Sequence, residues 1–255
     1  MMKNYKLTLQ YDGTRYSGWQ KQGNTDNTIQ AKLEAIAARL THVPTDVNGS
    51  GRTDAGVHAL GQIANFKWKN PSPEWSCEEI CAFFNKALPM DIRVIQVEET
   101  SERFHARLNA ASKHYRYILD NQNVPDVFER RYAARIPADP SPRVTYDIDA
   151  MNRAALLLLG EHDFKSFCDN KHMKKSTVRT IENITITHND GMLLFDFYGN
   201  GFLYHMVRIL TGTLLEIGNG SRQPEDIPAI LAAKSRQKAG FTAPAQGLFL
   251  VEVSY

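Results

Sequence analysis

The order of strand-like and helix-like segments constrains the fold of this chain more than any other feature. In the first part, alternating apolar and polar residues predict strands, and a 3.6-residue apolar period predicts helices. The order is strand, helix, strand, strand, helix, strand, which is the ferredoxin-like arrangement. The strands are expected at residues 5–11, 45–50, 62–68 and 92–97, and the helices at residues 28–40 and 76–88.

The second part roughly repeats this order. Its strands are expected at residues 113–119, 178–188, 192–198 and 248–253, and its helices at 147–159 and 202–217, with an extra helix at 224–233 and a proline-rich stretch at 137–142. We therefore expect an α+β fold with two related ferredoxin-like (βαββαβ) halves, residues 1–106 and 107–255, around a central, mostly antiparallel sheet. A catalytic cleft is expected between the halves, where sites commonly form.

The composition excludes several classes of protein. No apolar run approaches the roughly 18 residues that a membrane span needs, and the first residues do not have the layout of a signal peptide. A cytoplasmic protein without a membrane partner is therefore expected. Three cysteines make no disulfide framework, and Cys77 and Cys81 lack further ligands for a metal, so we interpret them as small core residues. The net charge of +2 neither indicates nor excludes a nucleic-acid binder.

The loop from Gly49 to His58 is the first candidate for chemistry. It has three glycines, which indicate tight turns or close approach to a ligand. Asp54 at its centre is a candidate catalytic carboxylate. The structural alternative is an Asx-turn. A metal bound by Asp54 and His58 is not expected, because no third ligand follows.

The predicted second half carries two further candidates. Tyr115 and Tyr117 alternate along a strand and are flanked by Lys and Arg, which suits base stacking but is equally typical of core tyrosines. Arg208 stands alone on a strongly apolar helix and therefore needs an anionic partner. That partner is either a structural carboxylate or a catalytic one that the cation keeps ionised.

Three weaker patterns remain. Arg107 lies at the junction of the halves and belongs, with Arg103, Lys113 and Arg116, to one of two local basic runs. The other basic run comprises Lys171, Lys174, Lys175 and Arg179. Such runs more often form a solvated surface than a binding site. The pair His162 and Asp163 suggests a hydrolase, but no serine in a nucleophile-elbow context accompanies it.

Taken in order, these motifs resemble those of the tRNA pseudouridine synthase A family. The run from Gly51 to Ala59 is similar to the signature loop of that family, and the resemblance extends over nearly the whole chain. The other matching blocks are Tyr11-Asp12-Gly13, Gly18-Trp19-Gln20, Thr28-Ile29-Gln30, Phe104-His105-Ala106-Arg107, Lys113-His114-Tyr115-Arg116-Tyr117, residues 160–168, residues 202–208 and Ala243-Pro244-Ala245-Gln246-Gly247-Leu248.

This resemblance implies an activity, a substrate and a set of roles. It implies isomerisation of uridine to pseudouridine at positions 38, 39 and 40 in the anticodon arm of tRNA, by a homodimer without metal or cofactor. It implies that Asp54 is the catalytic carboxylate and that Arg52 fills the space left by the flipped base. Tyr115 would stack on that base, Arg208 would pair with Asp54, and Arg107 would help to bind the RNA. Whether Asp54 acts as a nucleophile or as a base stays open.

Two other functions compete with this prediction. One is an RNA-binding protein of similar fold without catalysis, with Tyr115 and Tyr117 as a stacking platform. Such a binder has little need for Asp54 and Arg208 together. The other is a small-molecule hydrolase that uses Asp54 or the pair His162 and Asp163, for which the sequence offers no nucleophile or metal set.

Overall fold

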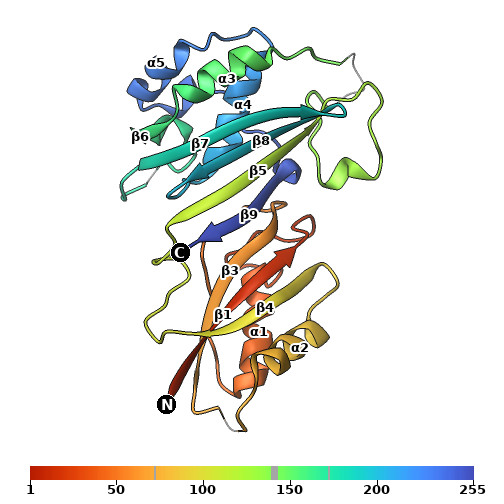
Figure 1. Cartoon of the computed structure of the whole chain (residues 1–255), viewed down its shortest axis with the longest axis vertical. Coiled ribbons are helices and arrows are strands. Elements are labelled where there is room, and N and C mark those ends of the chain that lie inside the picture. Colours follow the sequence, from red (N-terminus) through yellow and green to blue (C-terminus); the bar gives the residue numbers. More distant parts are fainter. Residues whose placement is uncertain (72, 139–142, 172) are drawn as a thin grey trace. The chain divides into compact units, whose positions relative to one another are not determined.

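A computed structural model describes residues 1–71, 73–138, 143–171 and 173–255, so most of the predicted proline-rich stretch lies outside the described residues. The backbone divides into two compact units. Unit 1 comprises Met1–Ala111 and Phe249–Tyr255, and unit 2 comprises Ser112–Leu248. Both units combine helices with strands that pair mostly antiparallel, which confirms the predicted α+β class (Figure 1). No helix in the described ranges is long and apolar enough to cross a membrane.

Unit 1 has the predicted order of strands and helices. Its sheet runs β4-β1-β3-β9, with β1 antiparallel to both of its neighbours. The last strand of the chain pairs in parallel with β3 at Phe249 and Leu250. The elements are β1 (Met2–Tyr11), α1 (Ile29–Thr41), β2 (Asn48–Gly49), β3 (His58–Lys69), α2 (Cys77–Ala87), β4 (Ile92–Thr100) and β9 (Leu248–Ser254).

Both helices of unit 1 start at capping residues. The Thr28 side chain accepts a hydrogen bond from the amide of Ala31 at the start of α1. Ser76 and Glu79 form the predicted capping box of α2, and each such cap stabilises a helix by about 1 kcal/mol. Phe84 of α2 packs on Phe66 of β3 with ring centroids 5.7 Å apart, in the core of this unit.

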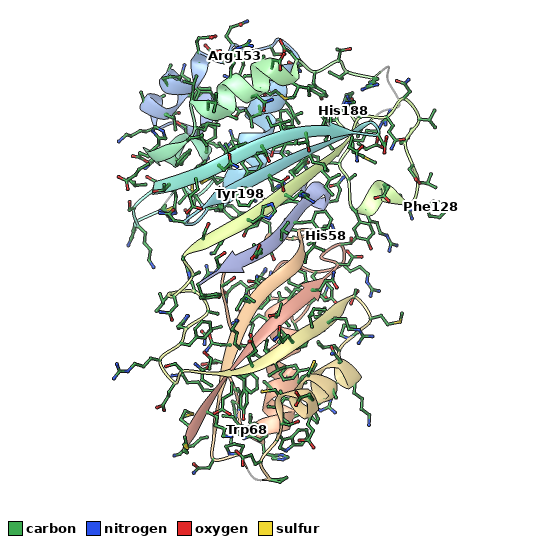
Figure 2. The ribbon with its side chains drawn as sticks, viewed as in Figure 1. His58, Trp68, Phe128, Arg153, His188 and Tyr198 are labelled. Atoms are coloured by element: carbon green, nitrogen blue, oxygen red, sulfur yellow. The ribbon has the colours of Figure 1, made fainter. Side chains whose placement is uncertain are left out.

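The long strand β3 connects that core to the candidate loop. Figure 2 labels Trp68 near one end of the strand and His58 at the other. His58 is the first residue after the glycine-rich loop, and it is 1% exposed. The loop therefore leads into a strand whose first residue is buried in the interior of unit 1.

Unit 2 has the strand order β5-β8-β7-β6, and neighbouring strands in this order pair antiparallel. Its helices α3, α4 and α5 lie on the same side of the strands (Figure 1). The strands are β5 (Ser112–Asp120), β6 (Gly160–Asp163), β7 (Val178–Asn189) and β8 (Met192–Gly199). The α-helices are α3 (Ile148–Leu156), α4 (Met206–Gly218) and α5 (Asp226–Ala233).

Two differences from the sequence prediction stand out in the described part of unit 2. Strand β6 was not predicted, because its four polar or small residues show no apolar alternation. Helix α4 begins at Met206 rather than at residue 202, because His205 has a left-handed backbone (φ 61°) that cannot continue a right-handed helix. The hairpin of β7 and β8 is confirmed, with positive φ at both Asp190 and Gly191 as its turn requires.

Candidate active site

The loop that carries Asp54 is held from inside unit 1. The hydroxyl of Tyr11 lies 2.8 Å from the Thr53 hydroxyl. The Gln62 side chain donates to the carbonyl of Gly51 at 3.1 Å and accepts from the Ser50 hydroxyl at 2.6 Å. Burial raises the pKa of Tyr11 to about 12, so its hydroxyl stays protonated as a hydrogen-bonding group. These contacts fix the residues on the N-terminal side of Asp54.

A second loop, residues 12–20, packs against the Asp54 loop. The amide of Trp19 donates to the Thr53 carbonyl at 3.0 Å. A Cβ atom on Gly13 would lie 1.9 Å from the Val57 carbonyl oxygen, and one on Gly18 would lie 2.7 Å from the Thr53 carbonyl oxygen. Both glycines are therefore required by close backbone approach, and they hold the chain on either side of Asp54.

Asp54 lies at the tip between these supports. It is half-buried, whereas Arg52 is exposed. The turn is closed by a backbone hydrogen bond of 3.2 Å from the Val57 amide to the Asp54 carbonyl, and Gly56 follows with φ 81°. This turn and the loop of residues 12–20 packed against it together form a preorganised support for the Asp54 carboxylate.

We expect Gly18→Ala to destabilise the protein and, if Asp54 is the catalytic carboxylate that the sequence predicts, to slow the reaction. Gly18 has φ +88°, and its added Cβ would meet Thr53 and Asp54. The left-handed backbone alone costs a non-glycine residue about 1–2 kcal/mol. A displacement of Asp54 by about 1 Å would lower kcat by up to about 100-fold. Urea unfolding and single-turnover kinetics measure the two effects.

Gly23→Ala is the matched control for this variant, because a Cβ on Gly23 meets nothing within 4 Å. It should leave both the free energy of unfolding and kcat near the wild-type values. Equal behaviour of the two alanine variants would show that the close approach of residues 12–20 does not position Asp54.

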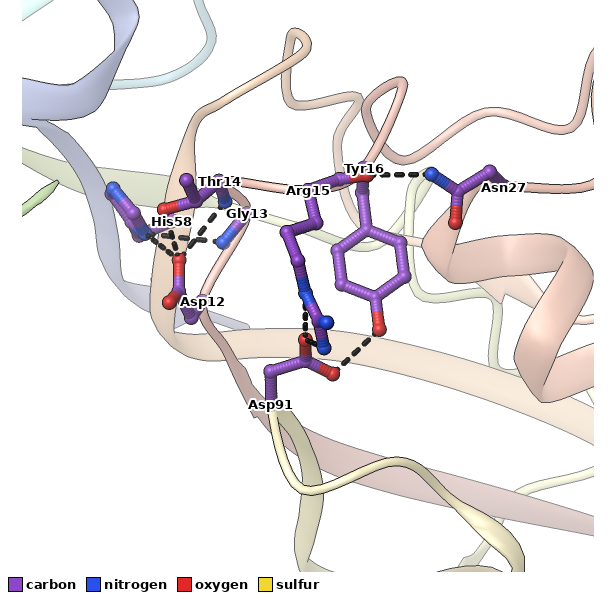
Figure 3. A network of polar contacts seen from close by, with 8 residues as sticks. All are labelled: Asp12, Gly13, Thr14, Arg15, Tyr16, Asn27, His58 and Asp91. Atoms are coloured by element: carbon purple, nitrogen blue, oxygen red, sulfur yellow. Dashed lines mark hydrogen bonds and ion pairs between the residues drawn. The ribbon is translucent and has the colours of Figure 1, made fainter.

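A polar network fixes the base of the second loop (Figure 3). The Asp91 carboxylate accepts hydrogen bonds from the Arg15 guanidinium and, at 2.6 Å, from the Tyr16 hydroxyl. The amide of Asp12 donates to the Asp91 carbonyl at 2.9 Å. The Asn27 side chain donates to the Arg15 carbonyl. Asp91 thereby ties the start of β4 to the loop that supports Asp54.

His58 joins the same network from the start of β3 (Figure 3). Its Nδ1 lies 3.1 Å from the Gly13 amide nitrogen and 3.2 Å from Oδ1 of Asp12. The first contact needs a lone pair on Nδ1 and the second needs a proton there, so only one of them is a hydrogen bond at a time. The imidazole also stacks on Phe249, with ring centroids 4.7 Å apart.

The Asp91 network makes the stability of the protein depend on pH. Burial alone would raise the pKa of Asp91, but the hydrogen bonds from Tyr16 and Arg15 outweigh it and hold that pKa below its usual value. A depressed pKa means that this stabilisation is complete above the unfolded-state pKa of about 3.9 and is lost as the pH falls through the folded-state pKa. Wild type should therefore exceed Asp91→Asn in free energy of unfolding at neutral pH.

This difference should stay constant from about pH 7 to about pH 4 and then shrink as urea unfolding is repeated down to about pH 3. Asp46→Asn, which removes an exposed carboxylate from the same unit, controls for the change in net charge. A gap between wild type and Asp91→Asn that stayed constant over this range would contradict the assignment.

Tyr115 and Tyr117 of β5 are both buried in the structure. The Tyr115 ring meets Phe202 edge to face, with centroids 5.2 Å apart. The Tyr117 hydroxyl donates to the Pro244 carbonyl at 2.9 Å. Burial raises the pKa of Tyr117, and the positive charge of Arg208 offsets part of that rise. Tyr117 is therefore tied into the interior of unit 2, close to Arg208.

Arg208 is half-buried on α4, as its apolar neighbours in the sequence predict. Its Nε donates to the carbonyl of Ala243 at 2.7 Å, and its own carbonyl accepts from the Ala243 amide at 3.1 Å. This pair of bonds fixes the root of the guanidinium group. The sequence did not indicate Ala243 as a partner, because a backbone carbonyl leaves no signal in residue identity.

Arg107 lies in a turn of unit 1 that is anchored through the backbone of the buried Ala106. The side chain of Asn65 accepts from the Ala106 amide at 2.9 Å, and the Tyr255 hydroxyl donates to the Ala106 carbonyl at 2.7 Å. Ala106 is fully buried, whereas Arg107 itself is exposed. The turn thus presents the Arg107 side chain to solvent from a fixed backbone.

Other charged candidates have structural partners. Arg116 forms two hydrogen bonds to the buried Asp196, at 2.8 and 3.2 Å. His162 contacts the Leu159 carbonyl at 2.8 Å. Asp163 caps the short helix that follows it, accepting from the Lys165 amide, and it bonds Thr177 and pairs with Lys234. His162 and Asp163, the pair that suggested a hydrolase, therefore make contacts that cap and support a turn.

The part of the chain that the structure describes contains no group of three or more His, Cys, Asp or Glu side chains that could hold a metal ion. Cys77, Cys81 and Cys168 are free thiols.

Sequence reasoning missed the groups that support the candidate residues. Gln62 and Asp91 were not singled out, although both bind the loops around Asp54. Gly18 and Trp19 were noted only as part of a motif. The glycine was a usable signal, because glycine is the default residue in tight turns that need a positive φ, and Gly18 has φ 88°.

Comparison with known proteins identifies the class to which this protein belongs. The family profile described as tRNA pseudouridine synthase matches residues 8–109 and 154–255. A match over most of the chain makes this protein an enzyme of the isomerase class. The chain belongs to the tRNA pseudouridine synthase family.

Its relatives cover the chain from end to end. The protein named tRNA pseudouridine synthase A of Bacillus sp. (strain KSM-64) is 44% identical over 254 residues, which is 100% of both chains. That of Moorella thermoacetica is 45% identical over 251 residues, which is 98% of both chains. A chain of the solved structure titled "Crystal Structure of a Cbf5-Nop10-Gar1 Complex" is 14% identical, with a TM-score of 0.37 over 83% of this chain and 45% of that chain.

Proposed function

We propose that this enzyme isomerises uridine to pseudouridine at positions 38, 39 and 40, in the anticodon arm of tRNA, with Asp54 as the catalytic carboxylate. Membership of the family supports the reaction and the tRNA substrate. The observation that carries the assignment of Asp54 is its place at the tip of a turn that Gly13, Gly18 and Tyr11 hold on both sides. Such preorganisation is typical of catalytic groups.

The chemistry asks for a carboxylate. The reaction breaks the C–N glycosidic bond, turns the uracil and forms a C–C bond. Asp54 either attacks as a nucleophile or removes a proton to start an elimination. Both roles need an ionised carboxylate, which the positive charge of Arg208 would favour. In this proposal the first part of the chain supplies the Asp54 loop, and the second part supplies the Tyr115 strand and the Arg208 helix.

The remaining candidate residues would bind the RNA. The target base must leave the helix stack before it reacts. Arg52, whose side chain is exposed, would fill the vacated space, and Tyr115 would stack on the flipped uracil. Arg107 would contact phosphates together with the basic run Lys171, Lys174, Lys175 and Arg179, so tRNA binding should weaken as salt rises. We further propose that the enzyme works in the cytoplasm as a homodimer, with one tRNA spanning both subunits.

Pseudouridine mapping tests the proposal directly. Unmodified tRNA is incubated with the purified protein, treated with carbodiimide and copied by primer extension. New stops are expected in the anticodon arm. A tRNA with cytidine in place of the uridines at positions 38, 39 and 40 should give none. Stops confined to another arm would contradict the site of action, and tRNA binding without any stop would favour the non-catalytic RNA-binding protein.

A further inference from the structure

One extended segment of unit 2, residues 239–244, lies along helix α4 in a fixed register. The Gly240 amide donates to the Thr213 hydroxyl at 2.9 Å, and the Phe241 amide donates to the Glu216 carboxylate at 3.2 Å. A Cβ atom on Gly212 would lie 2.0 Å from the Phe241 carbonyl oxygen, so the helix and the segment touch backbone to backbone. These contacts fix the position of the segment along the helix.

This segment orients two side chains of the proposed active site. The carbonyl of Ala243 accepts from Arg208 Nε at 2.7 Å, and the carbonyl of Pro244 accepts from the Tyr117 hydroxyl at 2.9 Å. The direction of the Arg208 guanidinium thus depends on where residues 243 and 244 lie. A rotation of that segment would turn the guanidinium without any change in α4 itself.

The carboxylate of Asp169 holds the segment at Thr242. Its Oδ1 accepts from Arg236 Nε at 2.7 Å, and its Oδ2 accepts from the Thr242 hydroxyl at 3.2 Å. The two amino groups of the same guanidinium donate to the Gly240 carbonyl at 2.8 Å and to the Thr242 hydroxyl at 2.9 Å. Asp169 and Arg236 therefore both bind Thr242, the residue directly before Ala243, whose carbonyl is the partner of Arg208.

The same carboxylate also holds the start of α4. Nδ1 of His205 lies 2.6 Å from Oδ2 of Asp169, and the Asp169 amide donates to the Tyr204 carbonyl at 3.3 Å. His205 has φ 61° and precedes the helix, whose N-terminus has no side-chain cap from that residue. Burial alone would raise the pKa of Asp169, but hydrogen bonds from His205 and Arg236 outweigh it and hold the pKa below its usual value.

We propose that Asp169, with His205 and Arg236, is a positioning group for the reaction: it locks the first turn of α4 to residues 239–244 and so sets the direction of the Arg208 guanidinium. This inference rests on the proposed role of Arg208 in catalysis. Asp169 does not itself need to touch the RNA. Its loss should therefore lower the rate of the chemical step more than it weakens tRNA binding.

The test compares Asp169→Asn with Asp163→Asn. Asp163 is a matched control, because it is also a partly buried carboxylate of unit 2 with a lowered pKa, but it binds Thr177 and Lys234 instead. We expect Asp169→Asn to lower the single-turnover rate constant by about 10- to 100-fold, with the Kd for tRNA changed by less than about 2-fold. Asp163→Asn should leave both quantities near wild type.

A spectroscopic signal follows Arg208 itself. In nitrogen-15-labelled protein, the Nε–H resonance of Arg208 is assigned as the one that disappears in Arg208→Lys. Because this proton is hydrogen-bonded to Ala243, it should exchange slowly in wild type and in Asp163→Asn, and rapidly in Asp169→Asn. Thr242→Val, which removes only the hydroxyl from the network, should show a smaller change in the same direction, and it covers the case that Asp169→Asn fails to fold.

Each failure has its own signature. If wild type forms no pseudouridine, the proposed function is wrong, while the exchange of the Arg208 proton still reports on the network. If wild type is active but Asp169→Asn and Thr242→Val keep both the rate and the slow exchange, the positioning role is wrong. Equal losses of rate in Asp169→Asn and Asp163→Asn would also overturn it, because they would indicate general destabilisation.

Discussion

Asp54→Asn should abolish pseudouridine formation while tRNA binding survives. The substitution keeps the size of the side chain but removes the charge that either a nucleophile or a base needs. The turn around residue 54 should persist, because it is held by the Val57 amide, by Tyr11 through Thr53 and by the close approach of Gly18, none of which involves the carboxylate. We expect a loss in rate of at least about 10³-fold.

Carbodiimide mapping and a filter-binding titration with the same tRNA measure the two halves of this prediction. Asp46→Asn, which removes an exposed carboxylate from the same unit, is the control and should keep full activity. An active Asp54→Asn enzyme would show that the catalytic assignment is wrong. Loss of tRNA binding together with activity would instead indicate that Asp54 serves the structure of the loop.

Arg208→Ala should damage both activity and stability. The variant loses the 2.7 Å bond from Nε to the carbonyl of Ala243, a fully buried residue. A buried acceptor without its partner costs about 1–3 kcal/mol. If Arg208 also keeps the catalytic carboxylate ionised, the rate should fall by about 10²- to 10³-fold, as for other charge-stabilising groups. In that case the substitution would also remove a partner of that carboxylate, which would add to the loss of stability.

Two further variants separate these effects. Arg208→Lys keeps the charge but loses the Nε donor, so it should recover part of the activity while remaining less stable than wild type. Arg153→Ala removes an exposed arginine from α3 and should change neither quantity (Figure 2). Urea unfolding and single-turnover kinetics provide the measurements. If the Arg208→Ala variant were less stable than wild type but fully active, Arg208 would have only a structural role.

Most elements of the fold could be predicted because their signals are local. The capping box of Ser76 and Glu79 is legible from residues three positions apart, and the hairpin turn from Asp190 and Gly191. Strand β6 was missed because its four residues do not alternate and so carry no periodic signal. The early start predicted for α4 reflects apolar residues whose periodicity continues past the left-handed His205.

The residues of the candidate site also differ in whether a local signal identifies them. Asp54 and Arg208 could be singled out from the sequence, because a carboxylate among glycines and a cation on an apolar helix are locally unusual. Their supports could not be found in this way. Gln62, Asp91 and Asp169 act through contacts with residues distant in the chain, and nothing near each of them predicts such a contact.

The sequence by itself determined the α+β class, the ordered motifs of the family and the residues with unusual chemistry. These depend on periods of two and 3.6 residues, on caps and on turns, whose energies arise between near neighbours in the chain. Only the tertiary structure decided that the last strand joins β3 in unit 1, that Gly13 must leave room for Val57, and that Asp169 ties α4 to residues 239–244. Such contacts depend on packing between distant segments, because side chains of many types can satisfy the same local pattern and only the assembled core selects among them.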